Sequence, residues 1–292
     1  MNVRIYIDGY NLYYGALKRT EFKWLDPVKL IKHVIITSAP EHLLPLENAK
    51  FFTKYFTSPV EPKLSFSKTA EADQKNYHHA LEAVYNPEEM QIIKGYHSVN
   101  PFNQRVVDNR SKSGPHPDSE IVEVWRIEEK QTDVNIAVEA MRDAFTCNDE
   151  QHFVFVSNDT DFFRLFETLN SLSHIHVGVI APGLDKNRRP SVGMKERSEW
   201  VRSYFMPEEL DQSQLPLKIT GSVRGRLKQY IRKPMEWYGQ RDLAVEIFEI
   251  LFKELKKRNA CYSWLEQAPY EGTELEIEPL KRPAIKMLDT EN

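Results

Sequence analysis

The stretch FVFVSNDTDFFRLFETL (153–169) decides the fold, because it holds a strand, a turn and a helix in immediate succession. Its first four residues are all apolar, which is typical of a strand buried on both faces of a parallel sheet. From residue 161 to residue 172 the apolar side chains recur at helical spacing. A strand that leads directly into a helix is the unit from which parallel sheets with right-handed crossovers are built.

Strands and helices alternate in the same way on both sides of this stretch. Further strands are expected at 3–7, 49–57, 90–99, 120–128 and 175–181. Helices are expected at 12–19, 27–36, 69–86 and 133–146. The polar segment 100–119 contains three prolines and is expected to be a loop. This order predicts an α/β fold with a mostly parallel central sheet.

Composition and charge exclude several classes of protein. The 292 residues carry a net charge of −4, which rules out a uniformly basic nucleic-acid binder but leaves room for a local basic patch. No apolar run approaches the roughly 18 residues that a membrane helix needs, and the N-terminus lacks the features of a secretory signal. The two cysteines exclude a disulfide framework and a cysteine-rich zinc site. We therefore expect a cytoplasmic protein with no membrane partner.

The composition changes in the last third of the chain. Residues 207–217 are acidic and polar and are expected to form a linker. Residues 218–265 are expected to form a small, mainly helical appendage, because 218–233 holds six basic residues and no acidic one, and 241–258 has an amphipathic pattern. Residues 266–292 hold seven acidic and three basic residues and are expected to be an extended or partly disordered tail.

Four aspartates follow or adjoin the ends of the expected strands. Asp8 comes directly after the first strand, Asp159 and Asp161 follow the strand 153–156, and Asp133 opens a helix. The carboxyl ends of parallel strands meet at one edge of a sheet, so we expect these side chains to lie close together. Clustered carboxylates repel one another unless a hard divalent cation neutralises them. Each aspartate taken alone also fits an ordinary helix cap.

Three stretches together resemble a known family. They are YIDGYNLYYG (6–15), KQTDVNIAVEAM (130–141) and the stretch 153–169. In this order they resemble the NYN domain of the PIN-like nuclease superfamily, and its LabA-like branch in particular, over residues 1–205. The resemblance implies a PIN-like three-layer α/β/α sandwich and metal-dependent cleavage of RNA.

The resemblance also assigns roles to the acidic residues. Asp8 and Asp161 would bind Mg²⁺ or Mn²⁺ directly or through water, and Asp133 and Asp159 would complete the cluster or orient the attacking water. All four would therefore be catalytic and metal-binding residues. Asn11 matches the asparagine that follows the first acidic residue of the family motif.

The surroundings of this cluster supply candidate contacts for a phosphate backbone. Asn11 could hydrogen-bond Asp8 or a phosphate, and it fits a turn residue equally well. Ser157 fits a helix cap better than a donor to a carboxylate or a phosphate, and Lys130 could neutralise a phosphate, although a solvated lysine is more common. The basic side chains that could track a nucleic acid are Arg105, Arg110, Lys112, Lys186, Arg188 and Arg189.

The sequence thus predicts a metal-dependent endoribonuclease, with residues 1–206 as the nuclease domain. A water activated at the four-aspartate site would hydrolyse RNA phosphodiester bonds. Single-stranded RNA is the expected partner, because Tyr10 could stack on unpaired bases. Helix packing is the better interpretation for Tyr13 and Tyr14. The sequence is compatible with a homo-oligomer.

Two other functions compete with this one. The first is an RNA-binding regulatory module that does not cleave, which would gain nothing from four clustered negative charges. The second is a phosphatase of the haloacid dehalogenase type, which wants a second aspartate two residues after Asp8, where this chain has Tyr10. The glycine-rich phosphate loops GxGxxG and GxxxxGK[ST] do not occur, which argues against a dinucleotide-dependent dehydrogenase or a P-loop enzyme.

Overall fold

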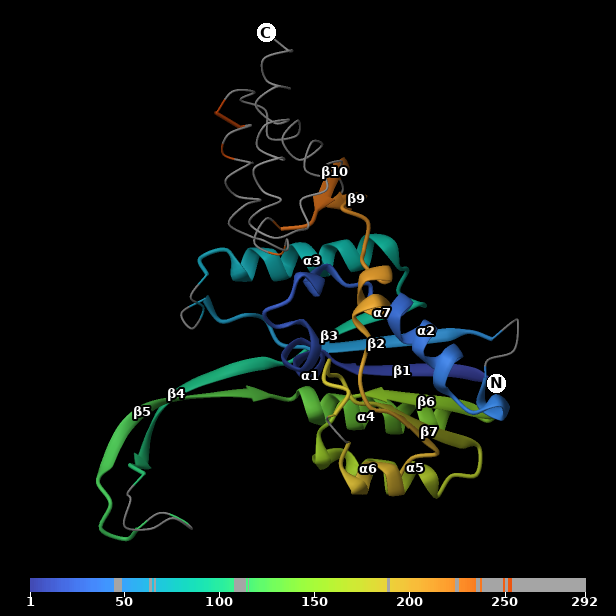
Figure 1. Ribbon diagram of the computed structural model, residues 1–292, viewed down its shortest axis with the longest axis horizontal. Helices are drawn as coiled ribbons and strands as arrows, with labels where there is room; N and C mark the ends of the chain where they lie inside the picture. Colours follow the sequence, from blue (N-terminus) through green and yellow to red (C-terminus); the bar gives the residue numbers. More distant parts are fainter. Residues whose placement is uncertain are drawn as a thin grey trace.

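The core of the protein is a six-stranded parallel sheet. The structure is a computed structural model that describes residues 1–44, 49–62, 65, 67–107, 114, 116–187, 190–223, 226–234, 237, 249, 252 and 253. The strand order is β3-β2-β1-β6-β7-β8, so the first strand of the chain lies near the centre (Figure 1). The strands are β1 (Asn2–Asp8), β2 (Phe51–Thr57), β3 (Met90–Lys94), β6 (Gln151–Val156), β7 (Ile175–Ile180) and β8 (Trp200–Arg202).

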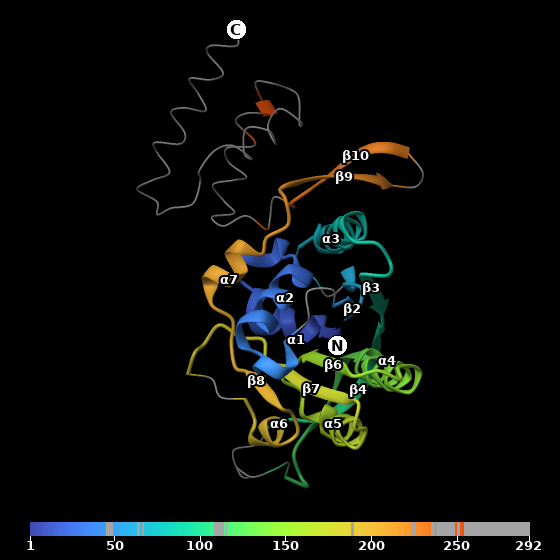
Figure 2. The same cartoon turned by 90° about the vertical axis from the view of Figure 1, so that its right-hand side faces the viewer.

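Helices cover both faces of this sheet, which confirms the predicted three-layer α/β/α sandwich. They are α2 (Pro27–Ser38), α3 (Ala70–Val84), α4 (Thr132–Thr146), α5 (Phe163–Asn170), α6 (Val192–Glu196) and α7 (Pro207–Gln212). Helices α2, α3 and α7 pack on the face that carries Val3, Ile5 and Ile7 of β1, whereas α4, α5 and α6 pack on the face that carries Tyr6 (Figure 2). The alternation along β1 thus divides the apolar core into two halves.

A buried polar network fixes α4 against the sheet. Lys54 Nζ of β2 lies 2.6 Å from Asp143 Oδ2 and 2.8 Å from Glu139 Oε2. The hydroxyl of Tyr6 donates to Asp143 at 2.8 Å, and Arg4 Nη1 lies 3.4 Å from the same carboxylate. Removing one partner of a buried ion pair leaves an uncompensated charge, so these contacts hold the helix in a defined position.

Short helical turns connect the larger elements. They are α1 (Gly9–Leu12), a π-helix η1 (Tyr13–Leu17), and the 3₁₀ turns η2 (Glu21–Trp24), η3 (Glu41–Leu43) and η5 (Thr160–Phe162). The helix expected at 12–19 is therefore a short α-helix that continues as a π-helix. A π-helix widens the turn and often marks a functional site.

A long antiparallel arm replaces part of the expected pattern. Strand β4 (Tyr96–Arg105) pairs with β5 (Ile121–Lys130), and the two project from the body of the molecule (Figure 1). The single strand expected at 90–99 is thus split between β3 and β4, and the expected loop at 100–119 is a strand as far as Arg105. The loop prediction was wrong at Pro101 because both strands of a two-stranded ribbon are edge strands, and proline is tolerated on an edge strand.

The segment after β8 packs on the body. Residues 207–217, expected to be a linker, begin with α7 (Pro207–Gln212) and bury Leu210 and Leu215 in the core. The indole nitrogen of Trp24 donates to the carbonyl of Pro216 at 2.9 Å. The apolar residues Leu210 and Leu215, and not the acidic residues on which the linker prediction rested, decide how this segment packs.

The described start of the appendage is a β-hairpin and not a helix. Strands β9 (Lys218–Val223) and β10 (Arg226–Arg232) pair antiparallel, and Ile219 and Ile231 are buried against the core. The helix expected at 241–258 lies outside the described residues except for residues 249, 252 and 253, which are helical, and the tail 266–292 lies wholly outside them. Within the described part of the chain, no helix is long and apolar enough to cross a membrane.

A chain truncated after Met206 should lose much of its stability. The truncation removes Leu210, Leu215 and Ile219 from the core, and each fully buried aliphatic side chain contributes roughly 1.5–3 kcal/mol of burial free energy. Thermal unfolding should show a melting temperature lower by at least about 10 °C, or an insoluble product. A matched truncation after Trp237 keeps these contacts and should unfold near the wild-type temperature. Equal stability of the two shortened chains would show that residues 207–237 do not support the body.

Candidate functional site

Asp8 is a buried carboxylate at the end of the central strand β1. Its side chain is 2% exposed and caps α1 by accepting from the backbone N–H of Asn11 at 2.9 Å. The Asn11 amide group donates to its other oxygen at 2.6 Å, and Ser157 Oγ donates to that same oxygen at 3.0 Å. The predicted contact between Asn11 and Asp8 is therefore present. The favoured cap role of Ser157 is wrong, because Asp159 is the residue that caps the next turn.

Asp159 and Asp161 follow the neighbouring strand β6. The backbone N–H of Asp159 donates to Ser157 Oγ at 3.1 Å, so the serine bridges the ends of two adjacent strands. Asp159 accepts from the backbone N–H of Asp161 at 3.0 Å and caps η5. Asp159 is half-buried and Asp161 is exposed, which leaves carboxylate oxygens available to a ligand.

Asp133 lies in the first turn of α4 and completes the group of four. The pKa of Asp133 is raised to about 6, first by partial burial and then by the neighbouring charges of Asp8, Asp159, Glu129 and Asp161, in that order. These repulsions place the predicted aspartates around one point, although they come from separate parts of the sequence. Topology alone brings them together, as expected for one edge of a parallel sheet.

Glu129 is a fifth carboxylate that the sequence analysis missed. It lies near the end of β5 and accepts from Ser58 Oγ at 2.8 Å and from Thr132 Oγ1 at 2.6 Å. Its charge contributes to the raised pKa of both Asp8 and Asp133. In the sequence Glu129 is an ordinary polar position of a half-exposed strand. The one indication in the sequence was that Glu129 lies four residues before Asp133, which opens the next helix.

Gly95 allows the base of the arm to approach this cluster. A Cβ atom at residue 95 would lie 2.5 Å from the carbonyl of Lys130, 2.7 Å from Thr132 Oγ1 and 2.9 Å from Ser58 Oγ. These distances are too short for any side chain, and the hydroxyls concerned are the ones that bind Glu129. Glycine at this position is therefore required for Glu129 to reach the aspartates.

The ligand chemistry of this cluster fits a hard divalent cation. Burial raises the pKa of Asp8 against the opposing effect of its hydrogen bonds from Asn11 and Ser157, so its negative charge is unfavourable without a positive partner. Among the described residues, no three Asp, Glu, His or Cys side chains already lie close enough to hold one ion. Mg²⁺ keeps several waters and needs only one or two carboxylates, so the arrangement suits a largely hydrated ion.

An aromatic cavity of about 730 Å³ opens at Gly9, the residue that directly follows Asp8. Tyr10, Tyr13 and Tyr14 line one wall and are 42%, 37% and 49% exposed. The interpretation of Tyr13 and Tyr14 as helix-packing residues is therefore wrong, because η1 turns them toward the cavity. The rings of Tyr10 and Tyr14 are 4.6 Å apart between centroids, and Lys18 Nζ lies 4.3 Å from the Tyr14 ring.

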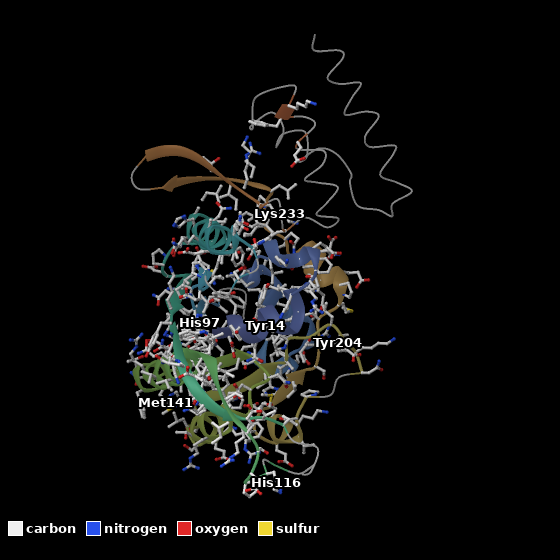
Figure 3. All side chains as sticks on the ribbon, turned by 90° about the vertical axis from the view of Figure 1, so that its left-hand side faces the viewer. Tyr14, His97, His116, Met141, Tyr204 and Lys233 are labelled. Atoms are coloured by element: carbon white, nitrogen blue, oxygen red, sulfur yellow. The ribbon has the colours of Figure 1, made fainter. Side chains whose placement is uncertain are left out.

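The lining of the cavity also contains two histidines. His78 is buried beside Tyr55 and Tyr77, and burial lowers its pKa to about 4, so it is neutral at physiological pH. His97 of β4 lies 6.4 Å from the Tyr10 ring between centroids (Figure 3). The volume is within the range of small-molecule and nucleotide sites.

Three of the predicted basic contacts lie in the described part of the chain, and two of these, Lys130 and Arg105, make contacts within the arm. Lys130 Nζ pairs with Glu128 at 2.7 Å on the arm. Arg105 donates to the carbonyl of Pro117 at 2.5 Å and pairs with Ile121 in the arm, far along the strand from Glu129. Lys186 is exposed. The other predicted basic residues, Arg110, Lys112, Arg188 and Arg189, lie outside the described residues.

Comparison with known families places this site in a wider group. The family model of the NYN domain matches residues 2–191, which include all four aspartates and Glu129. The chain belongs to the NYN domain family. It therefore has a nuclease-type fold, as the three sequence motifs predicted, whereas its place in the LabA-like branch stays a prediction.

One relative of this chain has a name that describes a different activity, that of a monooxygenase. The chain is 31% identical over 275 residues to 6-hydroxy-3-succinoylpyridine 3-monooxygenase HspA of Pseudomonas putida (strain DSM 28022 / S16), covering 91% of this chain and 85% of that protein. A crystal structure of a protein of unknown function from Vibrio parahaemolyticus RIMD 2210633 covers 71% of this chain and 94% of its own, with 18% identity and a TM-score of 0.39. That structure is too distant to support an argument about function.

Replacing Asp133 by asparagine should stabilise the protein at neutral pH and not in acid. The pKa of Asp133 is raised from its ordinary 3.8 to about 6, so the folded state binds the proton more tightly than the unfolded chain. Its ionisation therefore lowers stability as the pH rises from 3.8 through 6. Because the side chain is exposed, we expect a gain in melting temperature of only about 1–3 °C.

This expectation is checked by thermal unfolding in EDTA at about pH 4 and about pH 7.5. Asp149→Asn is the control, since Asp149 is an exposed aspartate ahead of β6, at the opposite end of that strand from Asp159. An equal gain at both pH values for Asp133→Asn would show that charge repulsion at the cluster is not its cause.

Proposed function

We propose that the protein is a metal-dependent endoribonuclease that hydrolyses phosphodiester bonds of single-stranded RNA. The observation that carries this proposal is the convergence of the four aspartates and Glu129 at one edge of the sheet. Carboxylates that lie near enough to raise the pKa of Asp133 disfavour the charged folded state unless they serve a ligand. The nuclease-type fold of the NYN domain supports the same conclusion.

Individual residues of the cluster have distinct tasks in this proposal. Asp8 and Asp161 would hold Mg²⁺ or Mn²⁺, with Asp8 fixed in orientation by Asn11 and Ser157. When bound, the cation lowers the pKa of a water and offsets charge on the phosphate. Asp133 would take the proton of the attacking water, because its raised pKa lies close to neutral pH.

The aromatic cavity would hold the base next to the scissile phosphate. Tyr10, Tyr13 and Tyr14 present partly exposed rings in the cavity at Gly9, and aromatic rings bind unpaired bases of any sequence by stacking. The cavity would thereby favour single strands, whose bases are free to leave a stack. Lys18, which lies over Tyr14, supplies a positive charge at this wall.

Substitution of the cluster by asparagine should abolish hydrolysis while the fold persists. Asp8→Asn, Asp133→Asn, Asp159→Asn and Asp161→Asn each remove one charge with almost no change in volume. We expect turnover of a labelled single-stranded RNA with Mn²⁺ or Mg²⁺ to fall by about 100-fold or more, and EDTA to stop the wild type. Asp149→Asn should cleave normally. Full activity of both the Asp133→Asn and the Asp161→Asn variants would show that the acidic cluster does not take part in hydrolysis.

Cleavage should yield 5′-phosphate and 3′-hydroxyl ends. Attack by water does not need the ribose 2′-hydroxyl, so a strand with a 2′-deoxy sugar at the cleaved position should still be cut. The alternative is a histidine pair that produces a 2′,3′-cyclic phosphate, and His78 and His97 both line the cavity. End-group analysis of the products and the activity of His97→Gln separate the two. Cyclic phosphate ends together with an inactive His97→Gln variant would replace the metal-dependent mechanism.

Oxygenation of a small aromatic compound is the second candidate. It is favoured by the aromatic cavity at Gly9 and by the 31% identity to a 6-hydroxy-3-succinoylpyridine 3-monooxygenase over most of both chains. The cavity walls suit a planar ring whether or not the ring belongs to RNA. Oxygen uptake that depends on 6-hydroxy-3-succinoylpyridine and an electron donor, in a protein that leaves RNA intact, would establish this candidate instead.

A further inference from the structure

The two faces of the arm differ in what they carry. Side chains alternate along a strand, and residues directly opposite in an antiparallel pair share a face. We call the face that includes Glu129 the cleft face. Its β5 members are Ile121, Glu123, Trp125, Ile127 and Glu129, opposite Arg105, Asn103, Pro101, Val99 and His97 of β4.

On the other face of the arm, charged side chains pair with one another and with an aromatic ring. Arg126 and Lys130 both form ion pairs with Glu128, the Lys130 pair at 2.7 Å. The Arg126 guanidinium also lies over the Phe102 ring at 4.7 Å from its centroid. The Phe102 ring is therefore partnered within the arm, although it stays 42% exposed, and Tyr96 on the same face is 49% exposed.

The cleft face instead leaves large apolar side chains in contact with water. Trp125 is 69% exposed, Ile121 57% and Ile127 45%. Among the described residues, no aromatic ring or cation packs on Trp125 as Arg126 does on Phe102. An exposed row of this kind on one side of a ribbon marks an interaction surface.

The cleft face is continuous with the site already described. His97 and Ile127 line the aromatic cavity, and Glu129 belongs to the acidic cluster. Trp125 lies two residues beyond Ile127 on the same face, which is about 13 Å along the strand from Glu129. Arg105 lies about 27 Å from Glu129 along the arm. The base of the arm at His97 and its tip near His116 are both labelled in Figure 3.

We propose that the cleft face is a binding track for the part of a single-stranded RNA that extends beyond the aromatic cavity. This inference rests on the proposed function. Trp125 would stack on an unpaired base, and Ile127 would bridge the cavity and the indole ring. Arg105 at the far end, whose Nη1 is held by the carbonyls of Pro117 and Ser119, would contact a phosphate through its remaining N–H groups. The track makes the arm a specificity element that selects long single strands over short ones.

Binding of labelled RNA tests this track without any need for cleavage. The full-length protein is titrated in EDTA with a single-stranded RNA of about 20 nucleotides and with one of about four nucleotides, which the cavity alone can hold. Trp125→Ala should lower the affinity for the long RNA by about tenfold or more and leave the affinity for the short RNA unchanged. Trp125→Phe should restore most of the affinity. Phe102→Ala is the matched control, since it removes a partly exposed aromatic ring from the other face of the arm, and it should bind both RNAs like the wild type.

Hydrolysis of bis(p-nitrophenyl) phosphate with Mn²⁺ separates this inference from the proposed function. Trp125→Ala should hydrolyse this small diester at the wild-type rate. If the diester is cut and Trp125→Ala binds the long RNA as tightly as the wild type, the track is refuted and the nuclease stands. If the wild type cuts neither RNA nor the diester, and Trp125→Ala binds long RNA more weakly than the wild type does, the nuclease is refuted and the track stands.

Light scattering provides the remaining control. A wild-type dimer that Trp125→Ala converts to a monomer, with RNA affinity unchanged, would assign the cleft face to contact with a second copy of the chain and overturn the proposal. An unchanged molar mass together with weakened binding of long RNA supports it.

Discussion

A carboxylate buried at the end of the central strand is the constraint on which the site depends. Asp8 is 2% exposed, and burial raises its pKa even though Asn11 and Ser157 donate hydrogen bonds to it. A buried charge without a positive partner is unfavourable, so this position opposes folding rather than supporting it. The two hydrogen-bond donors come from the first turn after β1 and from the end of β6. They fix the carboxylate in one orientation, as catalysis or metal binding requires.

The two ends of α4 show the difference between a structural and a functional carboxylate. Asp143, near the C-terminal end, accepts from Tyr6 and pairs with Lys54 and Arg4, so its charge is compensated inside the protein. Asp133, at the N-terminal end, faces other carboxylates and has a pKa raised to about 6. The first arrangement anchors the helix, and the helix in turn holds Asp133 against the repulsion of its neighbours. Stability supplied at one end thus permits an unfavourable charge at the other.

Local patterns in the sequence predicted the parallel sheet and the four aspartates, and they failed where contacts are non-local. Strand 153–156 and Asp159 could be placed because a strand, its turn and its helix are consecutive, and topology then brings strand ends together. Glu129 was missed because its role depends on a hydroxyl from Ser58, which is distant in the sequence. The arm was taken for a loop because its pairing, across a segment with prolines, is not encoded in either strand alone. Tyr14 was assigned to packing because a π-helix cannot be distinguished from an α-helix by apolar spacing.

The site combines two surfaces with different demands on a substrate. The aromatic wall formed by Tyr10, Tyr13 and Tyr14 accepts any planar ring, and nothing in stacking distinguishes a base from a small aromatic acid. The carboxylates are more selective, because they repel an anion unless a cation lies between them, and a phosphodiester is an anion that shares such a cation well. An NYN domain that turned over a small aromatic molecule would use the wall and have little need of the cluster. The two surfaces meet at Gly9, which lines the cavity and directly follows Asp8. Such an arrangement would suit a substrate that has a ring and a phosphate in adjacent positions, as a nucleotide of RNA has.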